Sequence, residues 1–251
     1  MTTTTTEPAP AATQPRPPWR TVLRTSAAAT VVLAIAHQWL NRFFGISLVA
    51  LAVLTAVGLV LELNRRRAGT LLLAGTSVVF LSLHAFILVL TVRYVELAET
   101  FITVSGLVVA LALTLIAAIQ TLRSSPTAQQ RPARTATVIA IGLGSLWAAA
   151  GVFSLTLRMN IDDISPEPGE LVVEVSDAPA RAPSIEVAAD EAVVFHNLDD
   201  SPLIIESAGA ELRLAVPAHH SRRVVLDADA GIYRYTIDGP DKRITGRLTV
   251  R

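Results

Sequence analysis

The sequence contains no cysteine among its 251 residues, and this absence removes several kinds of chemistry at once. Disulfides, zinc–thiolate sites, iron–sulfur clusters and cysteine nucleophiles are all excluded. Any copper site that needs a thiolate ligand is excluded for the same reason. The catalytic motifs G-x-S-x-G, H-E-x-x-H, the Walker loop and the dinucleotide fingerprint are missing too. We therefore expect a protein that is not an enzyme.

Lysine is almost absent, since Lys242 is the only one, and the charges are divided unevenly. Up to Leu157 there are 11 arginines and 4 acidic residues, whereas the remainder has 10 basic and 17 acidic residues. An acidic C-terminal part argues against nucleic acid as a partner. The two parts are expected to lie in different surroundings. The preference for arginine over lysine is typical of a high-GC bacterial genome.

Apolar residues are abundant: 51% of the chain is hydrophobic and the mean hydropathy is +0.50, which predicts membrane segments. Residues 1–18 form a Thr/Ala/Pro-rich arm that is expected to be disordered. Beyond it, residues 19–157 are predicted to form a bundle of five transmembrane helices. Each of five apolar stretches has 18 or more residues with few charges, and about 20 such residues are enough to cross the hydrocarbon. The stretches are 22–44, 46–63, 68–92, 101–122 and 135–157.

The arginines predict the orientation of the bundle, because cytoplasmic loops are enriched in positive charge. Nine arginines flank one side of the predicted spans and three flank the other. This favours a multi-pass protein of the cytoplasmic membrane with a cytoplasmic N-terminus and an extracytoplasmic C-terminal domain. The small-x-small pattern AIA at 34–36 resembles a signal-peptide cleavage site, so removal of residues 1–36 stays an alternative, although an uncleaved span is favoured.

The pattern changes to period two at about residue 170, after a linker at 158–169. Seven short alternating runs, separated by Pro, Gly and Asp, predict an antiparallel sandwich or barrel at 170–251. A domain of this size has one core and little room for an enclosed active site.

Three stretches of this domain carry a specific resemblance. ADEAVVFHNLDDSPLII is similar to the cupredoxin segment GDTVTFVNxDxxPHxV, VPAHHSRRVVLDADAGIYRYTI to VPAGxSxxVxLxxPGxYxYxC, and ITGRLTV to MxGxLxV. The order and spacing match those of the plastocyanin/amicyanin-like cupredoxins. The resemblance covers about a third of the chain and implies an all-β Greek-key sandwich. No family is recognised for the membrane part.

The resemblance also implies where copper ligands would stand, and none is present. Leu203 replaces the first histidine, Ile237 the cysteine and Ile244 the axial methionine, while the second histidine would fall near Pro240. These side chains offer no lone pair to a metal. No cofactor is therefore expected in this domain, and the apolar replacements are expected to fill the site.

Three histidines of the domain are weaker candidates. His219 and His220 are adjacent, and in a turn both side chains can reach one ion, so they are a possible surface metal site. The resemblance puts them in a turn away from the copper end, and two solvated histidines are the favoured interpretation. His196 is expected on the surface of a strand.

The membrane part contains two more histidines, His37 and His84, at about 10–12 Å below the outer surface. Ionisable residues at such depth are candidates for function. Three interpretations stay open: two axial ligands of haem b, two ligands of copper, or two neutral histidines bonded to neighbouring helices. The third is favoured.

Two patterns place these histidines on interior faces. Four polar residues recur every seven positions in the third stretch, which directs them toward other helices: Thr70, Ser77, His84 and Thr91. Asn41 lies four residues after His37 and shares its face. In the fifth stretch, Ala140, Gly144 and Ala148 predict close helix packing. Glu62, near the inner end of the second stretch, is expected to pair with Arg65–Arg67.

The leading hypothesis is a membrane protein that presents a copper-free cupredoxin-like domain outside the cytoplasm and serves as a binding or accessory subunit. Its partners would be membrane lipid and another membrane or extracytoplasmic protein. A redox or metal-handling role for His37 and His84 is the alternative. A small transporter, with the polar stripe of the third span lining its path, is a weaker one.

Overall fold

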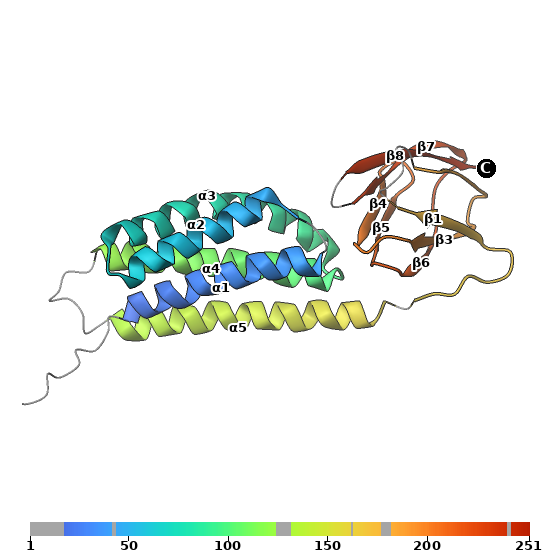
Figure 1. Ribbon diagram of the computed structural model, residues 1–251. Coiled ribbons are helices and arrows are strands. Elements are labelled where there is room, and N and C mark those ends of the chain that lie inside the picture. Colours follow the sequence, from blue (N-terminus) through green and yellow to red (C-terminus); the bar gives the residue numbers. More distant parts are fainter. Residues whose placement is uncertain (1–17, 42–43, 124–131, 162, 177–181, 240–241) are drawn as a thin grey trace, which may run out of the picture.

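The computed structural model describes residues 18–41, 44–123, 132–161, 163–176, 182–239 and 242–251. The predicted disordered arm and Pro240 therefore lie outside the described residues, apart from Pro18. Within these ranges the chain forms a helical bundle followed by a β domain, joined by a single connection (Figure 1). The helices are α1 Pro18–Leu40, α2 Ile46–Leu63, α3 Arg67–Thr91, the short 3₁₀ helix η1 Val92–Tyr94, α4 Ala98–Arg123 and α5 Pro132–Met159.

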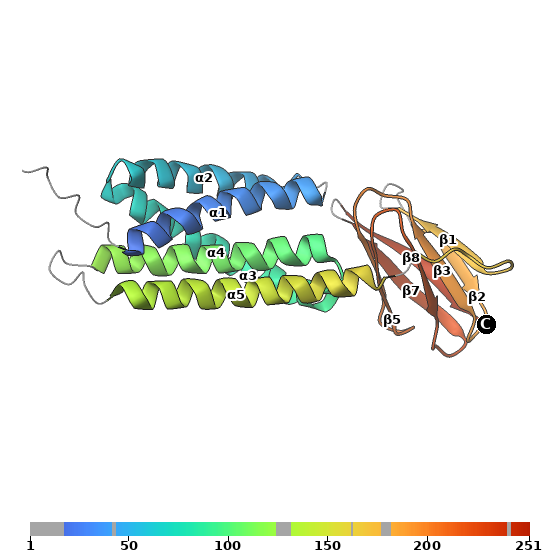
Figure 2. The ribbon, with the colours of Figure 1, turned by 90° about the horizontal axis from the view of Figure 1, so that it is seen from below.

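Helix α4 is the centre of the bundle, and it packs against α1, α3 and α5. Half of its most apolar 18-residue window is buried, compared with 11% for α5 at the periphery (Figure 2). The Trp147 indole of α5 donates a hydrogen bond of 3.0 Å to the Ile102 carbonyl of α4 and packs near Gly106. The predicted small-residue contact of α5 is wrong within this chain, because Ala148 is exposed and nothing lies near a Cβ built on Gly144.

Four helices in the described part of the chain are long and apolar enough to cross a membrane: α2, α3 with η1, α4 and α5. Helix α1 is not among them, and its first two turns contain Arg20 and Arg24. It also ends at Leu40, before the predicted limit at residue 44. It nevertheless packs along α4 and α2, with Leu23, Ala27 and Ala34 buried.

The prediction that Glu62 pairs with Arg65–Arg67 is wrong. Its side chain is almost fully buried and forms an ion pair with Arg24 of α1, while Arg20 approaches to 3.9 Å. Arg65 takes a left-handed conformation (φ 58°) in the tight turn between α2 and α3. The turn brings the α3 backbone so close to α2 that a Cβ on Gly69 would lie 2.3 Å from the Glu62 nitrogen.

The β domain consists, within the described residues, of two packed sheets. One has the order β1-β3-β6 and the other the order β2-β8-β7-β4-β5. The strands are β1 Leu171–Val175, β2 Ser184–Val187, β3 Ala192–Asn197, β4 Leu203–Ser207, β5 Leu212–Val216, β6 Ser221–Val225, β7 Gly231–Asp238 and β8 Arg243–Val250.

The sequence-based expectation of seven antiparallel strands needs two corrections. The run at 185–197 splits into β2 and β3, because a turn with Asp190 in the left-handed region (φ 63°) interrupts it. In addition, β1 runs parallel to β3 and β2 runs parallel to β8. Period-two patterning reports which face of a strand is buried, but it contains no information on the direction of the neighbouring strand.

The core between the sheets contains one particularly close contact, between Tyr235 and Gly246. Tyr235 is completely buried, and its hydroxyl donates a hydrogen bond of 2.6 Å to the Pro183 carbonyl. Gly246 lies directly across from it on β8, where a Cβ would come within 2.4 Å of the ring. Burial raises the pKa of the Tyr235 hydroxyl, which keeps it a hydrogen-bond donor.

Candidate functional site at the junction of bundle and sandwich

The residues that replace the implied copper ligands form a packed apolar group. Leu203 and Ile237 are completely buried, and Ile244 is 4% exposed. They converge because β7 pairs with both β4 and β8, with Ile237 directly opposite Ile244. All three side chains belong to the core of the sandwich. The residues present at these three positions therefore do not fit a type-1 copper site, which needs thiolate and imidazole ligands.

The turn with His219 and His220 lies at this same end of the sandwich, contrary to the expectation that it lies elsewhere. It joins β5 to β6, and the last residue of β5, Val216, pairs with Leu203 at the start of β4. The sequence resemblance did not show this, because the relative position of loops depends on strand register.

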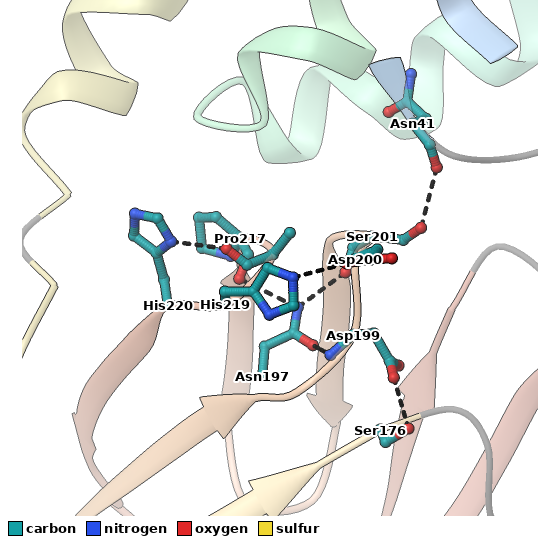
Figure 3. Close-up of polar contacts among 10 residues, drawn as sticks. Asn41, Ser176, Asn197, Asp199, Asp200, Ser201, Pro217, His219 and His220 are labelled. Carbon is teal, nitrogen blue, oxygen red and sulfur yellow. Dashed lines mark hydrogen bonds and ion pairs between the residues drawn. The ribbon is translucent and has the colours of Figure 1, made fainter. Parts of the chain in front are cut away.

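The two histidines do not converge on one point. His219, in the left-handed region (φ 56°), places its Nε2 2.8 Å from an Asp200 carboxylate oxygen at the exposed surface. His220 instead donates from Nδ1 to the Ala218 carbonyl at 2.7 Å (Figure 3). His196 is half-buried on β3, with its Nδ1 2.8 Å from the Ser221 hydroxyl. Among the described residues, no three His, Asp or Glu side chains gather as a metal site.

Asn197 organises this end of the sandwich, and the sequence reasoning missed it. It is fully buried, and its amide nitrogen donates to the carbonyls of Ser201, Val216 and Pro217 at 2.9–3.1 Å. Its side-chain oxygen accepts from the Asp199 backbone N–H at 2.8 Å. One side chain thereby ties the loop before β4 to the turn after β5 (Figure 3). The sequence does contain one signal for this role, because Asn197 is a polar residue at the end of a hydrophobic strand, just before a turn.

The end of the sandwich that contains Leu203 is seated on the end of the bundle at which α1 finishes. The Ser201 hydroxyl donates a hydrogen bond of 3.0 Å to the backbone carbonyl of Asn41, just after α1 (Figure 3). The Asn41 side chain donates in turn to the His37 carbonyl at 2.9 Å and accepts from the Thr100 hydroxyl of α4. A hydrogen-bonded connection therefore runs from Asn197 through Ser201 to the interior polar residues of the bundle.

A second contact is made by the outward face of the five-stranded sheet. Tyr94 and Leu97, between α3 and α4, pack against Ile204 and Ala215. The Tyr94 hydroxyl donates to the Glu206 carboxylate and accepts from Arg213 at 3.3 Å. The Arg213 guanidinium also lies over the Tyr94 ring, 4.8 Å from its centre, in a cation–π contact.

Charged groups surround these two contacts. Arg222 of β6 lies 3.9 Å from Glu96, and Arg158 at the end of α5 lies 4.0 Å from Glu99. Arg158 also comes within 3.4 Å of the His220 ring. Such partly exposed pairs contribute little stability, but they fix orientation. The apolar and buried contacts of Tyr94 and Ser201 are the main determinants of the junction.

Comparisons with known proteins return partial matches to solved structures. No protein-family model and no curated protein matches the sequence. Among solved structures, a reduced copper(I) form of an amicyanin mutant is 18% identical, with a TM-score of 0.29, and covers 34% of this chain and 86% of that one. A copper(I) form of a second amicyanin mutant is 20% identical, and an oxidised form of a third is 22% identical, with TM-scores of 0.29 and 0.28 and the same coverage. The chain combines helices that are apolar and long enough to cross a membrane with a two-sheet β domain, and the part similar to these amicyanins is about a third of the chain.

Proposed function

We propose that this chain is a non-enzymatic, multi-pass protein of the cytoplasmic membrane, with five spans and a cytoplasmic N-terminus. Its extracytoplasmic domain is a copper-free Greek-key sandwich of cupredoxin type, and it serves as a binding or accessory subunit of a membrane complex. The observation that supports this proposal best is the junction: the end that would carry copper is filled with Leu203, Ile237 and Ile244 and rests on the chain's own bundle. Recognition of a partner must then use another surface.

The open part of the five-stranded sheet offers such a surface. A groove of about 730 Å³ lies along β7 and β8, lined by residues that include Ile232, Arg234 and Arg247. The two arginines face each other directly across the strands, and neither forms an ion pair with any residue that the structure describes. Like charges in this position are unfavourable. An acidic segment of a partner protein would relieve the repulsion by forming charge-assisted hydrogen bonds.

Site-specific photocrosslinking in native membranes tests this role. A benzoyl-phenylalanine at Ile232, which is exposed in the groove, should give a crosslinked adduct with a second protein. The adduct should be lost when Arg234→Gln and Arg247→Gln are introduced together. The matched control is the same probe at Val172, which is exposed on the other sheet and should give no adduct. Equal crosslinking at both positions would contradict the proposal. So would an adduct that persists when both arginines are replaced.

The copper-free state of the sandwich has a separate test. The full-length protein incubated with Cu(II) should develop no intense blue charge-transfer band, because no thiolate is available. A stoichiometric, copper-dependent redox signal that requires His196, His219 or His220 would show that the sandwich does handle copper.

A further inference from the structure

Helix α3 has two faces of different character. The predicted polar stripe lies inside the bundle, and its four members are only 1–8% exposed: Thr70, Ser77, His84 and Thr91. The Nδ1 of His84 lies 2.9 Å from the Phe80 carbonyl of its own helix, whereas the Nδ1 of His37 lies 2.6 Å from the Thr103 hydroxyl of α4. The opposite face of α3 is apolar and exposed, at Val79, Leu83, Phe86 and Val89. Since polar residues of a membrane bundle face its interior, this apolar face is the one that contacts lipid chains.

Arg93 lies where this apolar face ends, in η1. It follows Phe86 by seven residues, which is about two helical turns, so the two residues share a face. Its side chain is exposed and forms no hydrogen bond or ion pair with any residue that the structure describes. An arginine near the end of a membrane span extends its guanidinium to the level of the lipid headgroups.

A pocket of about 300 Å³ lies at this level, where η1 meets the hairpin of β4 and β5 (Figure 1, Figure 2). Arg93 lines the pocket from the bundle, and Glu206, Glu211 and Arg213 are among the residues that line it from the sandwich. Glu206 already accepts from the Tyr94 hydroxyl and lies 3.8 Å from Arg213. Glu211 is exposed, and its carboxylate has no partner within the described part of the chain.

Arg213 is held in position but is only partly used. Its guanidinium lies over the Tyr94 ring, and its Nε is the atom that approaches the Tyr94 hydroxyl and Glu206. The two terminal nitrogens make no contact of this kind with the residues that the structure describes. The pocket therefore presents donors from two guanidinium groups, which suit a phosphate, and one unpaired carboxylate, which suits an ammonium group.

We propose that this pocket binds the headgroup of one phosphatidylethanolamine molecule, whose chains lie along the exposed face of α3. The phosphate accepts hydrogen bonds from Arg93 and Arg213, and the primary ammonium donates to Glu211. Phosphatidylcholine has the same phosphate, but its quaternary ammonium has no hydrogen to donate. Phosphatidylglycerol has no positive charge to place beside Glu211. The site rests on the membrane insertion of the bundle proposed above, but neither on its orientation nor on the protein partner.

The test is native mass spectrometry of the full-length protein, released from detergent micelles that contain equal amounts of phosphatidylethanolamine, phosphatidylcholine and phosphatidylglycerol with matched chains. The expected result is one phosphatidylethanolamine per chain, preferred over phosphatidylcholine by about tenfold, as one hydrogen bond between charged groups provides. Arg93→Gln should weaken retention of both lipids by about tenfold, because both contain the phosphate. Glu211→Gln should remove the preference and leave the retention of phosphatidylcholine unchanged.

The matched controls are Arg66→Gln, in the turn between α2 and α3, and Glu174→Gln, on the other sheet of the sandwich. Both side chains are exposed, and both variants should retain phosphatidylethanolamine as the wild type does. Equal retention of the three lipids by the wild type, or a preference that survives Glu211→Gln, overturns the site.

Soluble O-phosphoethanolamine separates the lipid from its free headgroup. At the same concentration it should not displace the lipid, because it lacks the chains that lie on α3. Displacement would overturn the assignment to a lipid. Absence of every lipid would also count against the membrane insertion of the bundle, whereas unselective retention overturns the headgroup site alone and leaves the photocrosslinking result of the proposed function unaffected.

Discussion

Gly246 illustrates how one missing side chain controls the sandwich core. A Cβ there would lie 2.4 Å from the Tyr235 ring and 2.8 Å from the Ala182 Cβ. Gly246→Ala should therefore lower the free energy of unfolding of the sandwich by about 1–3 kcal/mol, as overpacking does. Chemical denaturation of the full-length protein, followed by tyrosine fluorescence, measures this. Thr245→Ala is the matched control, since Thr245 is exposed, and its effect should stay within about 0.5 kcal/mol.

A second prediction at the scale of single residues concerns Asn197. Asn197→Ala removes the donor shared by three buried carbonyls. Leaving a buried polar group without a hydrogen-bond partner costs about 1–3 kcal/mol of stability. The free energy of unfolding should fall by at least that amount, and amide exchange at 198–202 should accelerate. Asp200→Ala should change little, because that side chain is exposed. Equal effects of both substitutions would contradict the role given to Asn197.

At the scale of elements, α1 and α2 are joined by the buried Glu62 carboxylate. Arg24→Ala leaves this charge without its nearest partner, and breaking such a pair costs about 3–5 kcal/mol when fully buried. Because Arg24 is partly exposed and Arg20 remains nearby, the lower end of that range is expected. Thermal unfolding in detergent measures the loss. Arg66→Ala tests the rejected local pairing and should leave the melting temperature unchanged.

The linker before β1 is held against β6 by an ion pair between Glu170 and Arg223. The Arg223 guanidinium holds the pKa of the Glu170 carboxyl below its usual range, mainly through a hydrogen bond. A depressed folded-state pKa means that the contact stabilises the fold above the unfolded-state pKa and is lost as the pH falls through the folded-state value. Hydrogen exchange at 163–171, corrected for the intrinsic rate, should therefore rise in acid. Arg223→Gln should remove this pH dependence, and an unchanged profile would speak against the ion pair.

At the scale of the whole molecule, Tyr94 connects bundle and sandwich. Tyr94→Ala removes the apolar contact, the hydrogen bonds and the cation–π contact together, so the sandwich should move more freely. Since the chain has no cysteine, two spin labels at Ile46→Cys and Thr245→Cys report the distance between the two parts cleanly. A narrow distance distribution should broaden in Tyr94→Ala but not in Tyr233→Phe. Identical distributions in all three proteins would contradict the docked arrangement.

Much of this architecture follows from local sequence patterns. Apolar runs of about 20 residues predicted the helices α2 to α5, and period-two runs predicted the strands of the sandwich. The seven-residue spacing in α3 correctly placed His84 on an interior face. These predictions succeed because burial of a face depends on residues close together in the sequence.

The sequence by itself determined that thiolate chemistry is absent and that Leu203, Ile237 and Ile244 stand where the resemblance implies copper ligands. The tertiary structure alone decided that Glu62 pairs with α1, and that the turn of His219 lies at the same end of the sandwich as Leu203. It also decided that this end rests on Asn41 of the bundle. Each of these depends on strand register or helix packing between residues far apart in the chain, and neither composition nor periodicity encodes which distant partner is chosen.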